Sequence, residues 1–402
     1  MFHQVPSSAE EPSIRLQAEY NVDCDPYKIN VVGSEYKTRR LRPWVFPVVK
    51  KVGCLWMAKS IMFHNPELDH EYPPMGGVTE FVNPAVRLLL GSSDAIQQGR
   101  VARIQTLAST GGMHTGAVLL ALYQRQLPTV YVANVAGDHH RRIFAQVGFQ
   151  VKEYPYYAKH ALDYRGLLRM MRYAPRNSLF VLPACGHPSG VDPTPTQWRG
   201  IADVMQHKSH LPFFDCSYQG LASGDLDKDA WAVRYFVARG FELFAVQSFS
   251  TIFGLANERV GNLTVVCRTA EDARRVFSQL EIIQRGEVLG PPLHGLRIIS
   301  LILNDPEMFA EWKSQLRKIH RRVTSIRKAL YDHFTVLQTP GTWHIKNQKG
   351  MFWWIELNAS QLKVLKDKYH IYAAENGHIC LAGLSKTNVG YFAKAVDEAL
   401  RQ

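Results

Sequence analysis

Hydroxyl side chains and one arginine stand at two places where a strand-like run gives way to a helical pattern. Ser109 and Thr110 open the sequence Ser-Thr-Gly-Gly at the start of one helical pattern, whereas Ser248 and Ser250 end the run FELFAVQSFS, with Arg259 following. Backbone N–H groups at a helix start, hydroxyls and a guanidinium suit the oxygens of a phosphate group. The first turn lacks the Gly-Lys-Ser/Thr ending of a Walker A loop. The sequence therefore predicts a phosphate cup of another kind.

A carboxylate and a phenol follow a further strand-like run, LPFFD, which ends at Asp215 and is followed by Tyr218. A buried carboxylate needs a cation or a hydrogen-bond donor beside it, and a protonated pyridine nitrogen is such a partner. A phosphate cup, a carboxylate and a phenol together are what pyridoxal 5'-phosphate requires. One alternative stays open: the carboxylate could serve a helix end or neighbouring backbone N–H groups instead.

The elements that must position these residues alternate between residues 100 and 270. Short apolar runs interchange with amphipathic segments, which predicts a mainly parallel sheet with helices on both faces. Ligands of such sheets bind beyond the carboxyl ends of the strands. Two further runs, YVANVAG and FVLPACG, lead to the pair His139-His140 and to His187. We interpret the adjacent pair as one solvated and one structural histidine, because no metal-ligand pattern accompanies it. The strand-like runs are RVARIQTLAS, TVYVAN, SLFVLPA, LPFFD, FELFAVQSFS and GNLTVVC.

The segment 306–334 reads as one long helix, with apolar residues at alternating steps of four and three. It carries the densest basic stretch of a chain whose net charge is +12. We interpret the basic residues as a solvated face, since no nucleic-acid module accompanies them. Nucleic-acid binding remains an alternative, and a positive potential would also attract small dianions. We predict an N-terminal arm over 1–14, a small domain of 15–42 plus 320–402 and a large domain over 43–319.

The composition is that of a globular protein with a sizeable core, 46% hydrophobic and 20% charged. Six scattered cysteines with no Cys-x-x-Cys pair indicate free thiols in a reducing compartment. The first residues contain no secretory pattern, and no apolar run is long enough to span a bilayer. We therefore expect a cytoplasmic protein with no membrane or metal partner.

Four stretches carry a family resemblance that extends from about Arg15 to the C-terminus. They are HEYPPMGG, GVDPTPTQW, FFDCSYQGLASGDLDKDAW and AVQSFSTIFGLANERVGNLTVVC. These stretches resemble the cytosolic aspartate aminotransferases, a class-I family that depends on pyridoxal phosphate. The resemblance implies an α/β protein of fold type I, with a seven-stranded, mainly parallel sheet, a smaller α+β domain and a homodimeric assembly.

The resemblance also implies roles for single residues. Asp215 falls on the partner of the pyridine nitrogen and Tyr218 on the phenol beside the ring hydroxyl. His140 and His187 fall on the imidazoles behind them. The phosphate positions of the family are matched by Ser109, Thr110, Ser248, Ser250 and Arg259. Two residues match groups that reach across the dimer: Tyr72 towards the phosphate and Arg285 towards the distal carboxylate of the substrate.

Most other substrate-side positions depart from the family. Thr251 stands at the lysine that holds the cofactor covalently. Gly137 stands where a tryptophan stacks on the ring, and HNPTG is shortened to HPSG at residues 187–190, which removes an asparagine. His378 replaces the arginine that binds the substrate α-carboxylate, and Ser34 replaces a glycine of the same pocket. Lys349 is a candidate substitute amine, although a surface lysine is the alternative interpretation.

The retained cofactor positions, together with the altered substrate-side positions, allow two functions. A lysine both holds the aldehyde and moves a proton during transamination, and a threonine does neither. The first is therefore an aspartate aminotransferase with impaired turnover of L-aspartate and 2-oxoglutarate. The second is a non-catalytic member of the fold, which binds a pyridoxal derivative or a dicarboxylate without a covalent bond or pairs with an active aminotransferase subunit.

Overall fold

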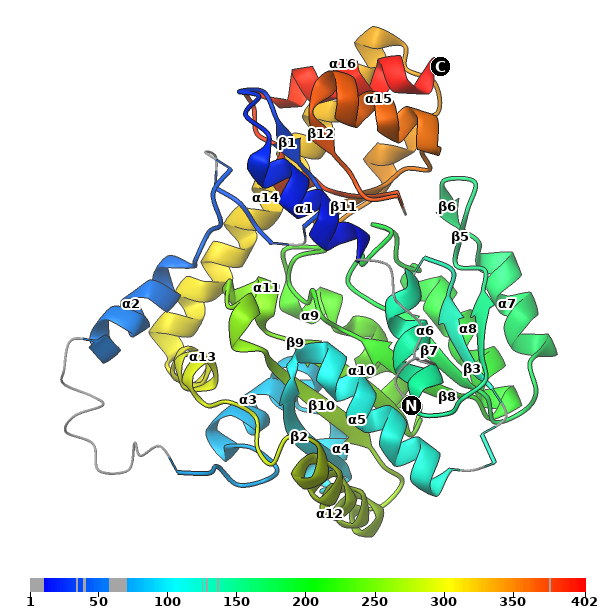
Figure 1. Ribbon diagram of the computed structural model, residues 1–402. Helices are drawn as coiled ribbons and strands as arrows, with labels where there is room; N and C mark the ends of the chain where they lie inside the picture. The colour runs from blue at the N-terminus through cyan, green and yellow to red at the C-terminus, as the bar shows by residue number, and fades with distance from the viewer. Residues whose placement is uncertain are drawn as a thin grey trace, which may run out of the picture.

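The computed structural model describes residues 11–33, 35–38, 41–57, 71–124, 126–127, 129–135, 137–375 and 377–402. Its centre is one seven-stranded sheet with the order β2-β10-β9-β8-β7-β3-β4 (Figure 1). Only β10 runs antiparallel to its neighbours, so the predicted mainly parallel sheet is confirmed. The strands are β2 (Val101–Leu107), β3 (Val130–Ala133), β4 (Val151–Tyr154), β7 (Leu179–Pro183), β8 (Leu211–Asp215), β9 (Leu243–Ser248) and β10 (Val260–Val266).

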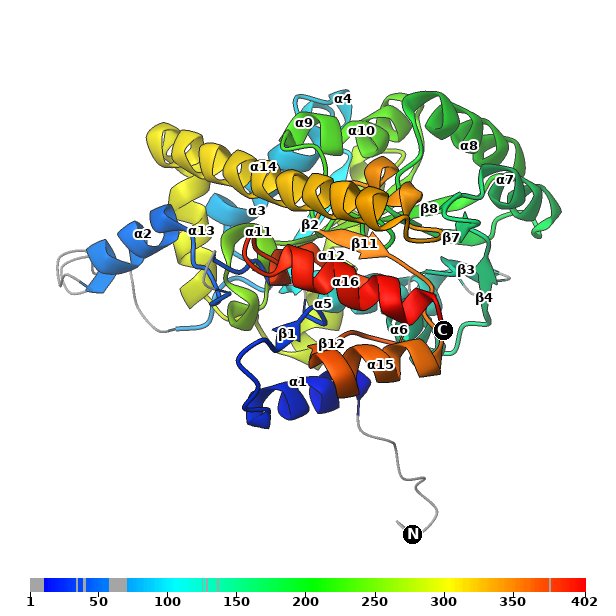
Figure 2. The same cartoon turned by 90° about the horizontal axis from the view of Figure 1, so that it is seen from above.

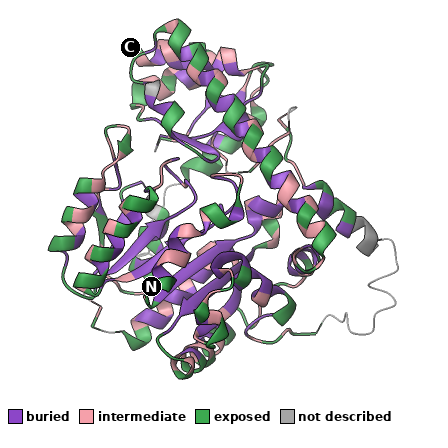
Figure 3. Ribbon diagram, turned by 180° about the vertical axis from the view of Figure 1, so that it is seen from behind, coloured by how far each residue is buried: buried purple, intermediate pink, exposed green. Residues whose placement is uncertain are grey.

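Continuous apolar runs form the inner strands because helices cover both faces of the sheet. All residues of β3, β7, β9 and β10 are buried, and most of the sheet is purple in Figure 3. The six runs read from the sequence correspond to β2, β3, β7, β8, β9 and β10. The edge strand β4 was not among them, because its sequence VKEY is short and exposes two charged residues.

Two groups of helices pack on the two faces, and adjacent residues of β8 point to opposite ones. Phe213 packs in the cluster with α5 (Ala108–Tyr123), α6 (Gly137–Gln146) and α12 (Ala270–Glu287). Phe214 packs in the cluster with the second group. That group consists of α3 (Thr79–Leu90), α7 (Tyr164–Tyr173), α8 (Pro195–Lys208) and α10 (Trp231–Ala238).

A second group of elements packs around the C-terminal half of α14 (Pro306–Leu337), as Figures 1 and 2 show. β1 pairs with β12 in parallel and so joins the two ends of the chain. The helix α14 passes through the predicted domain bound at 319/320 without a break, and α1 begins at Pro12, within the predicted arm. The domain bounds stay a prediction. The group comprises α1 (Pro12–Val22), β1 (Ile29–Asn30), β11 (Phe352–Trp354), α15 (Ala359–Tyr369), β12 (Ile371–Tyr372), β13 (His378–Cys380) and α16 (Val389–Leu400).

The long helix is amphipathic, as predicted. Its apolar residues at steps of three and four are all buried, namely Trp312, Leu316, Ile319, Val323, Ile326 and Leu330. The remaining elements are α2 (Pro47–Met57), α4 (Asp94–Gln97), β5 (Tyr157–Ala158), β6 (Ala161–Leu162), α9 (Leu226–Asp229), α11 (Ser250–Phe253), η2 (Ala256–Glu258), α13 (His294–Asn304), η3 (Trp343–Asn347) and η4 (Leu381–Gly383). Within the described ranges, no helix has the length and apolar character needed to cross a membrane.

Candidate functional site

The register of β10 brings the two hydroxyl-rich turns to one edge of the sheet. Gly261 of β10 pairs with Ser248 at the end of β9, and the Ala108 N–H donates to the Arg259 carbonyl at 2.9 Å. A Cβ on Gly261 would lie 2.4 Å from the backbone of Ala108, so only glycine permits this approach. The first turn of α5 therefore lies close to the first turn of α11 and to the residue before β10. This arrangement brings the predicted phosphate-binding hydroxyls to one place.

Ser250 carries a buried hydroxyl that fits a phosphate oxygen. Its residue is 8% exposed, and no described group hydrogen-bonds to its Oγ. Its backbone N–H donates to the Ser248 Oγ at 3.3 Å. A buried hydroxyl without a partner is unfavourable by about 1–3 kcal/mol, and an anionic oxygen in the cup would remove that cost. The donors present therefore fit the phosphate of the expected cofactor.

Asp215 ends β8 and is buried among three hydrogen-bond donors. One carboxylate oxygen faces His140 Nε2 at 3.1 Å, and the other accepts from the Ser217 N–H at 3.1 Å and from the Ser217 hydroxyl. Burial alone would raise the pKa of Asp215, but His140, His187 and Ser217 outweigh it and hold that pKa well below its usual range. An ionised carboxylate here fits a protonated pyridine nitrogen. The backbone interaction kept open in the sequence is also present, through Ser217.

The histidine pair divides as the sequence predicted. His139 is exposed, whereas His140 is 5% exposed and faces Asp215. In the part of the chain that the structure describes, no group of three His, Cys, Asp or Glu side chains is arranged to hold a metal ion. The pair therefore contributes one group to the interior of the site and one to its rim.

Four rings form a continuous cluster beside Asp215. His187 stacks on Tyr218 with ring centroids 4.4 Å apart, and Phe352 meets both edge-on at 5.2 Å. His378 packs on Phe352 at 4.2 Å. Burial is the largest influence on both imidazoles and lowers the pKa of His187 to about 3 and that of His378 to about 4. With no carboxylate bound, the imidazole of His378 is therefore neutral at neutral pH.

Thr251 is the second residue of α11 and is half-buried. Its neighbours Ser250 and Ile252 are buried, so the turn itself is fixed against the core. The position brings a hydroxyl, and no amine, next to the cup.

Three of the remaining expected residues are exposed. Tyr72 is 73% exposed, and Arg285 is exposed in the last turn of α12. Arg259 is also exposed and donates to the Ala256 carbonyl at 3.2 Å. Gly137 is the first residue of α6, and Ser34 lies outside the described residues.

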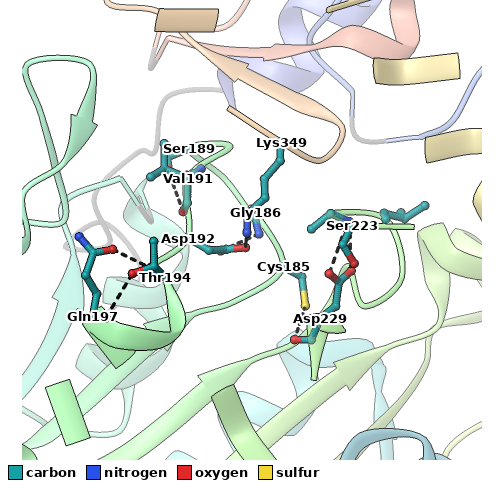
Figure 4. Close-up of polar contacts among 12 residues, drawn as sticks. Cys185, Gly186, Ser189, Val191, Asp192, Thr194, Gln197, Ser223, Asp229 and Lys349 are labelled. Carbon is teal, nitrogen blue, oxygen red and sulfur yellow. Dashed lines mark hydrogen bonds and ion pairs between the residues drawn. The ribbon is translucent and has the colours of Figure 1, made fainter. Parts of the chain in front are cut away.

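Lys349 extends from the segment before β11 towards the loop after β7 (Figure 4). Its Nζ lies 3.0 Å from Asp192 Oδ2, while Asp192 Oδ1 accepts from the Gly186 N–H at 2.8 Å. Burial lowers the pKa of Lys349, but the charge of Asp192 outweighs it and leaves the pKa raised. No pattern in the sequence assigned a role to Asp192, Ser217 or the ring of Phe352.

The chain is similar to known aminotransferases in both sequence and structure. Residues 46–396 match the family model described as aminotransferase class I and II. The cytoplasmic aspartate aminotransferase of Gallus gallus is 42% identical, with 100% of this chain and 98% of that protein covered. The cytoplasmic aspartate aminotransferase of Saccharomyces cerevisiae has a similar structure, with a TM-score of 0.92 and 34% identity over 100% of this chain and 98% of that one. An aromatic-amino-acid aminotransferase from Burkholderia pseudomallei, covalently bound to pyridoxal phosphate, has a TM-score of 0.93 and 29% identity over 100% and 99%.

Proposed function

The chain belongs to the aminotransferase class I and II family, and we propose that it is an aspartate aminotransferase-like protein with impaired turnover. The family reaction converts L-aspartate and 2-oxoglutarate to oxaloacetate and L-glutamate. The proposal keeps the cofactor site and the dicarboxylic substrate class of these relatives but assigns this chain little catalysis. Thr251 is the single observation that carries it.

Thr251 cannot replace an amine in this chemistry. When bound, pyridoxal phosphate supplies an aldehyde that reacts with amines and a ring that withdraws electrons. A threonine hydroxyl is a poor nucleophile and a very weak base near neutral pH, so it neither attaches the aldehyde nor moves a proton. The loss of a general base alone typically slows a reaction by about 10²–10⁴-fold.

The remaining residues support binding of the cofactor without a covalent bond. Ser109, Thr110, Ser248 and Ser250 would hold the phosphate together with Arg259. Asp215 would hold the ring nitrogen, with His140 supporting its charge, and Tyr218 would face the ring hydroxyl beside His187. The unpaired hydroxyl of Ser250 and the lowered pKa of Asp215 support this assignment.

Substrate binding is weakened on the same reasoning. A neutral His378 gives the α-carboxylate no charged partner, whereas an arginine supplies a two-pronged one. A hydrogen bond to a charged group is worth about 1.5–3 kcal/mol, so this exchange alone weakens binding about 10- to 150-fold. Arg285 would still recognise the distal carboxylate, whereas Ser34 falls on a position of the α-carboxylate pocket.

Initial rates test the proposal. Purified protein with pyridoxal phosphate, L-aspartate and 2-oxoglutarate should form glutamate at least about 100-fold more slowly than the chicken cytoplasmic enzyme assayed alongside. A no-protein reaction gives the background. A rate within tenfold of the chicken enzyme would contradict the proposal.

A second candidate is a partner subunit of an active aminotransferase, and the exposure of Tyr72 and Arg285 favours it. Both would act across a dimer interface, so a subunit without turnover could still complete a neighbour's site. Co-expression with an active homologue carrying a different affinity tag should give a mixed dimer after tandem purification. Recovery of homodimers or monomers alone would count against this candidate.

We further propose that the chain forms homodimers. We also propose that it is cytoplasmic, because its relatives are named as cytoplasmic enzymes.

A further inference from the structure

His139 has no role in the site as described so far, yet it faces the predicted phosphate cup. It lies in the first turn of α6, and its Nε2 is 3.2 Å from the Oγ1 of Thr110 in the first turn of α5. Its neighbour His140 turns to Asp215, and the two imidazoles are tilted by 46° with centroids 5.9 Å apart. The start of α6 thus directs one imidazole to the ring-nitrogen carboxylate and the other to the cup.

The surroundings of His139 suit an anion. The residue lies at the exposed rim of the site, while Arg259 and Arg142 provide positive charge and Asp215 a negative one. Desolvation by the surrounding protein, and then the charge of His140, lower the pKa of His139. A neutral imidazole has one N–H donor, and a nearby dianion would favour a second proton and a second donor. Thr110 and His139 can therefore both turn their donors to one phosphate group.

We propose that His139 binds the phosphate of a non-covalently held pyridoxal phosphate, side by side with Thr110. This inference rests on the proposed function, because it assigns a residue to the same cofactor. Two observations carry it independently: the contact between His139 and Thr110, and the buried hydroxyl of Ser250 that has no described partner in the cup. Without a lysine, retention of the cofactor depends on contacts of this kind.

The test compares two ligands that differ only in the phosphate. Equilibrium binding of pyridoxal 5'-phosphate and of pyridoxal is measured by fluorescence titration on the full-length wild type and on His139→Ala. We expect the substitution to weaken pyridoxal phosphate about tenfold and to change pyridoxal less than twofold. His139→Gln keeps an N–H donor and should recover most of the loss. Arg141→Ala removes a positive charge from the same helix and should leave both affinities within about twofold.

A double substitution shows whether the two residues share one ligand group. Thr110→Val combined with His139→Ala should lose less affinity than the sum of the two single losses, because the contacts depend on each other. Equal affinity of wild type and His139→Ala for pyridoxal phosphate would overturn the inference alone. Equal losses for both ligands would overturn it as well, since they would indicate a structural role. If the wild type binds neither ligand, non-covalent cofactor binding fails too.

Discussion

The ammonium group of Lys349 lies 3.0 Å from the carboxylate of Asp192, which also accepts a hydrogen bond from the Gly186 N–H. This pair ties the segment before β11 to the loop that carries His187 (Figure 4). An amine must lose its proton before it attacks an aldehyde, and the raised pKa of Lys349 opposes that loss. The ion pair thus favours the charged form of Lys349, and we predict that this residue does not replace the absent lysine.

We expect Lys349→Ala to leave the binding of pyridoxal phosphate unchanged. Loss of the ion pair should lower the free energy of unfolding, because the Asp192 side chain is only 11% exposed and would lose its charged partner. Borohydride treatment followed by peptide mass mapping checks the chemical claim. A cofactor-modified peptide containing Lys349 in the wild type would refute it.

Thr251→Lys should restore a covalent bond to the cofactor. The position lies between buried neighbours next to the cup, so an introduced amine would face a bound aldehyde. The wild type should bind pyridoxine 5'-phosphate and pyridoxal 5'-phosphate about equally, because it forms no bond with the aldehyde. The lysine variant should prefer the aldehyde and retain it after borohydride treatment and denaturation.

Thr251→Ala is the matched control and should bind both ligands as the wild type does. If the lysine variant retains no cofactor after reduction, the bound aldehyde does not lie near position 251. A reducible bond already present in the wild type would mean that another amine performs the task.

Asp215→Asn should weaken binding of pyridoxal phosphate. The substitution removes the negative charge that a protonated ring nitrogen needs, a contact worth about 1.5–3 kcal/mol, or about 10- to 150-fold in affinity. Ser217→Ala removes one donor to the same carboxylate and should alter affinity less. Calorimetric titration of both variants with pyridoxal phosphate distinguishes a cofactor-binding role of Asp215 from a purely structural one. An unchanged affinity in Asp215→Asn would reduce Asp215 to a structural residue that serves His140 and Ser217.

The sequence predicted the sheet from its apolar inner runs, but it could not predict pairings between distant segments. β4 escaped detection because VKEY is an edge strand with exposed charges. The ion pair of Lys349 could not be predicted, because Asp192 stands 157 positions earlier and no local pattern connects the two. His378 stands at an arginine position of the family, and its burial beside Phe352, which lowers the pKa of its imidazole, could not be read from the sequence. The ion pair of Lys349 and the pKa of His378 depend on tertiary packing, which cannot be predicted from composition or residue spacing.

His378 also predicts how stability depends on pH. The folded protein keeps its imidazole neutral down to about pH 4, whereas an ordinary histidine in the unfolded chain takes up a proton near 6.5. Because the folded pKa is lowered, the unfolded state binds more protons between these values, and stability falls as the pH falls from 6.5 to 4. At about 1.4 kcal/mol per pKa unit, His378 accounts for no more than about 3.5 kcal/mol of this loss. His187, whose pKa is lowered to about 3, acts in the same direction.

Urea unfolding at pH 7, 6, 5 and 4.5 measures this effect in the wild type and in His378→Gln. The variant cannot take up the proton, so its free energy of unfolding should fall less over this range. His333→Gln alters an exposed histidine of α14 and should retain the wild-type slope. Asp215 acts in a separate window, because its lowered pKa removes stability only as the pH falls below about 4. Equal slopes for wild type and His378→Gln would mean that His378 is not held neutral, and a charged His378 could then bind a carboxylate after all.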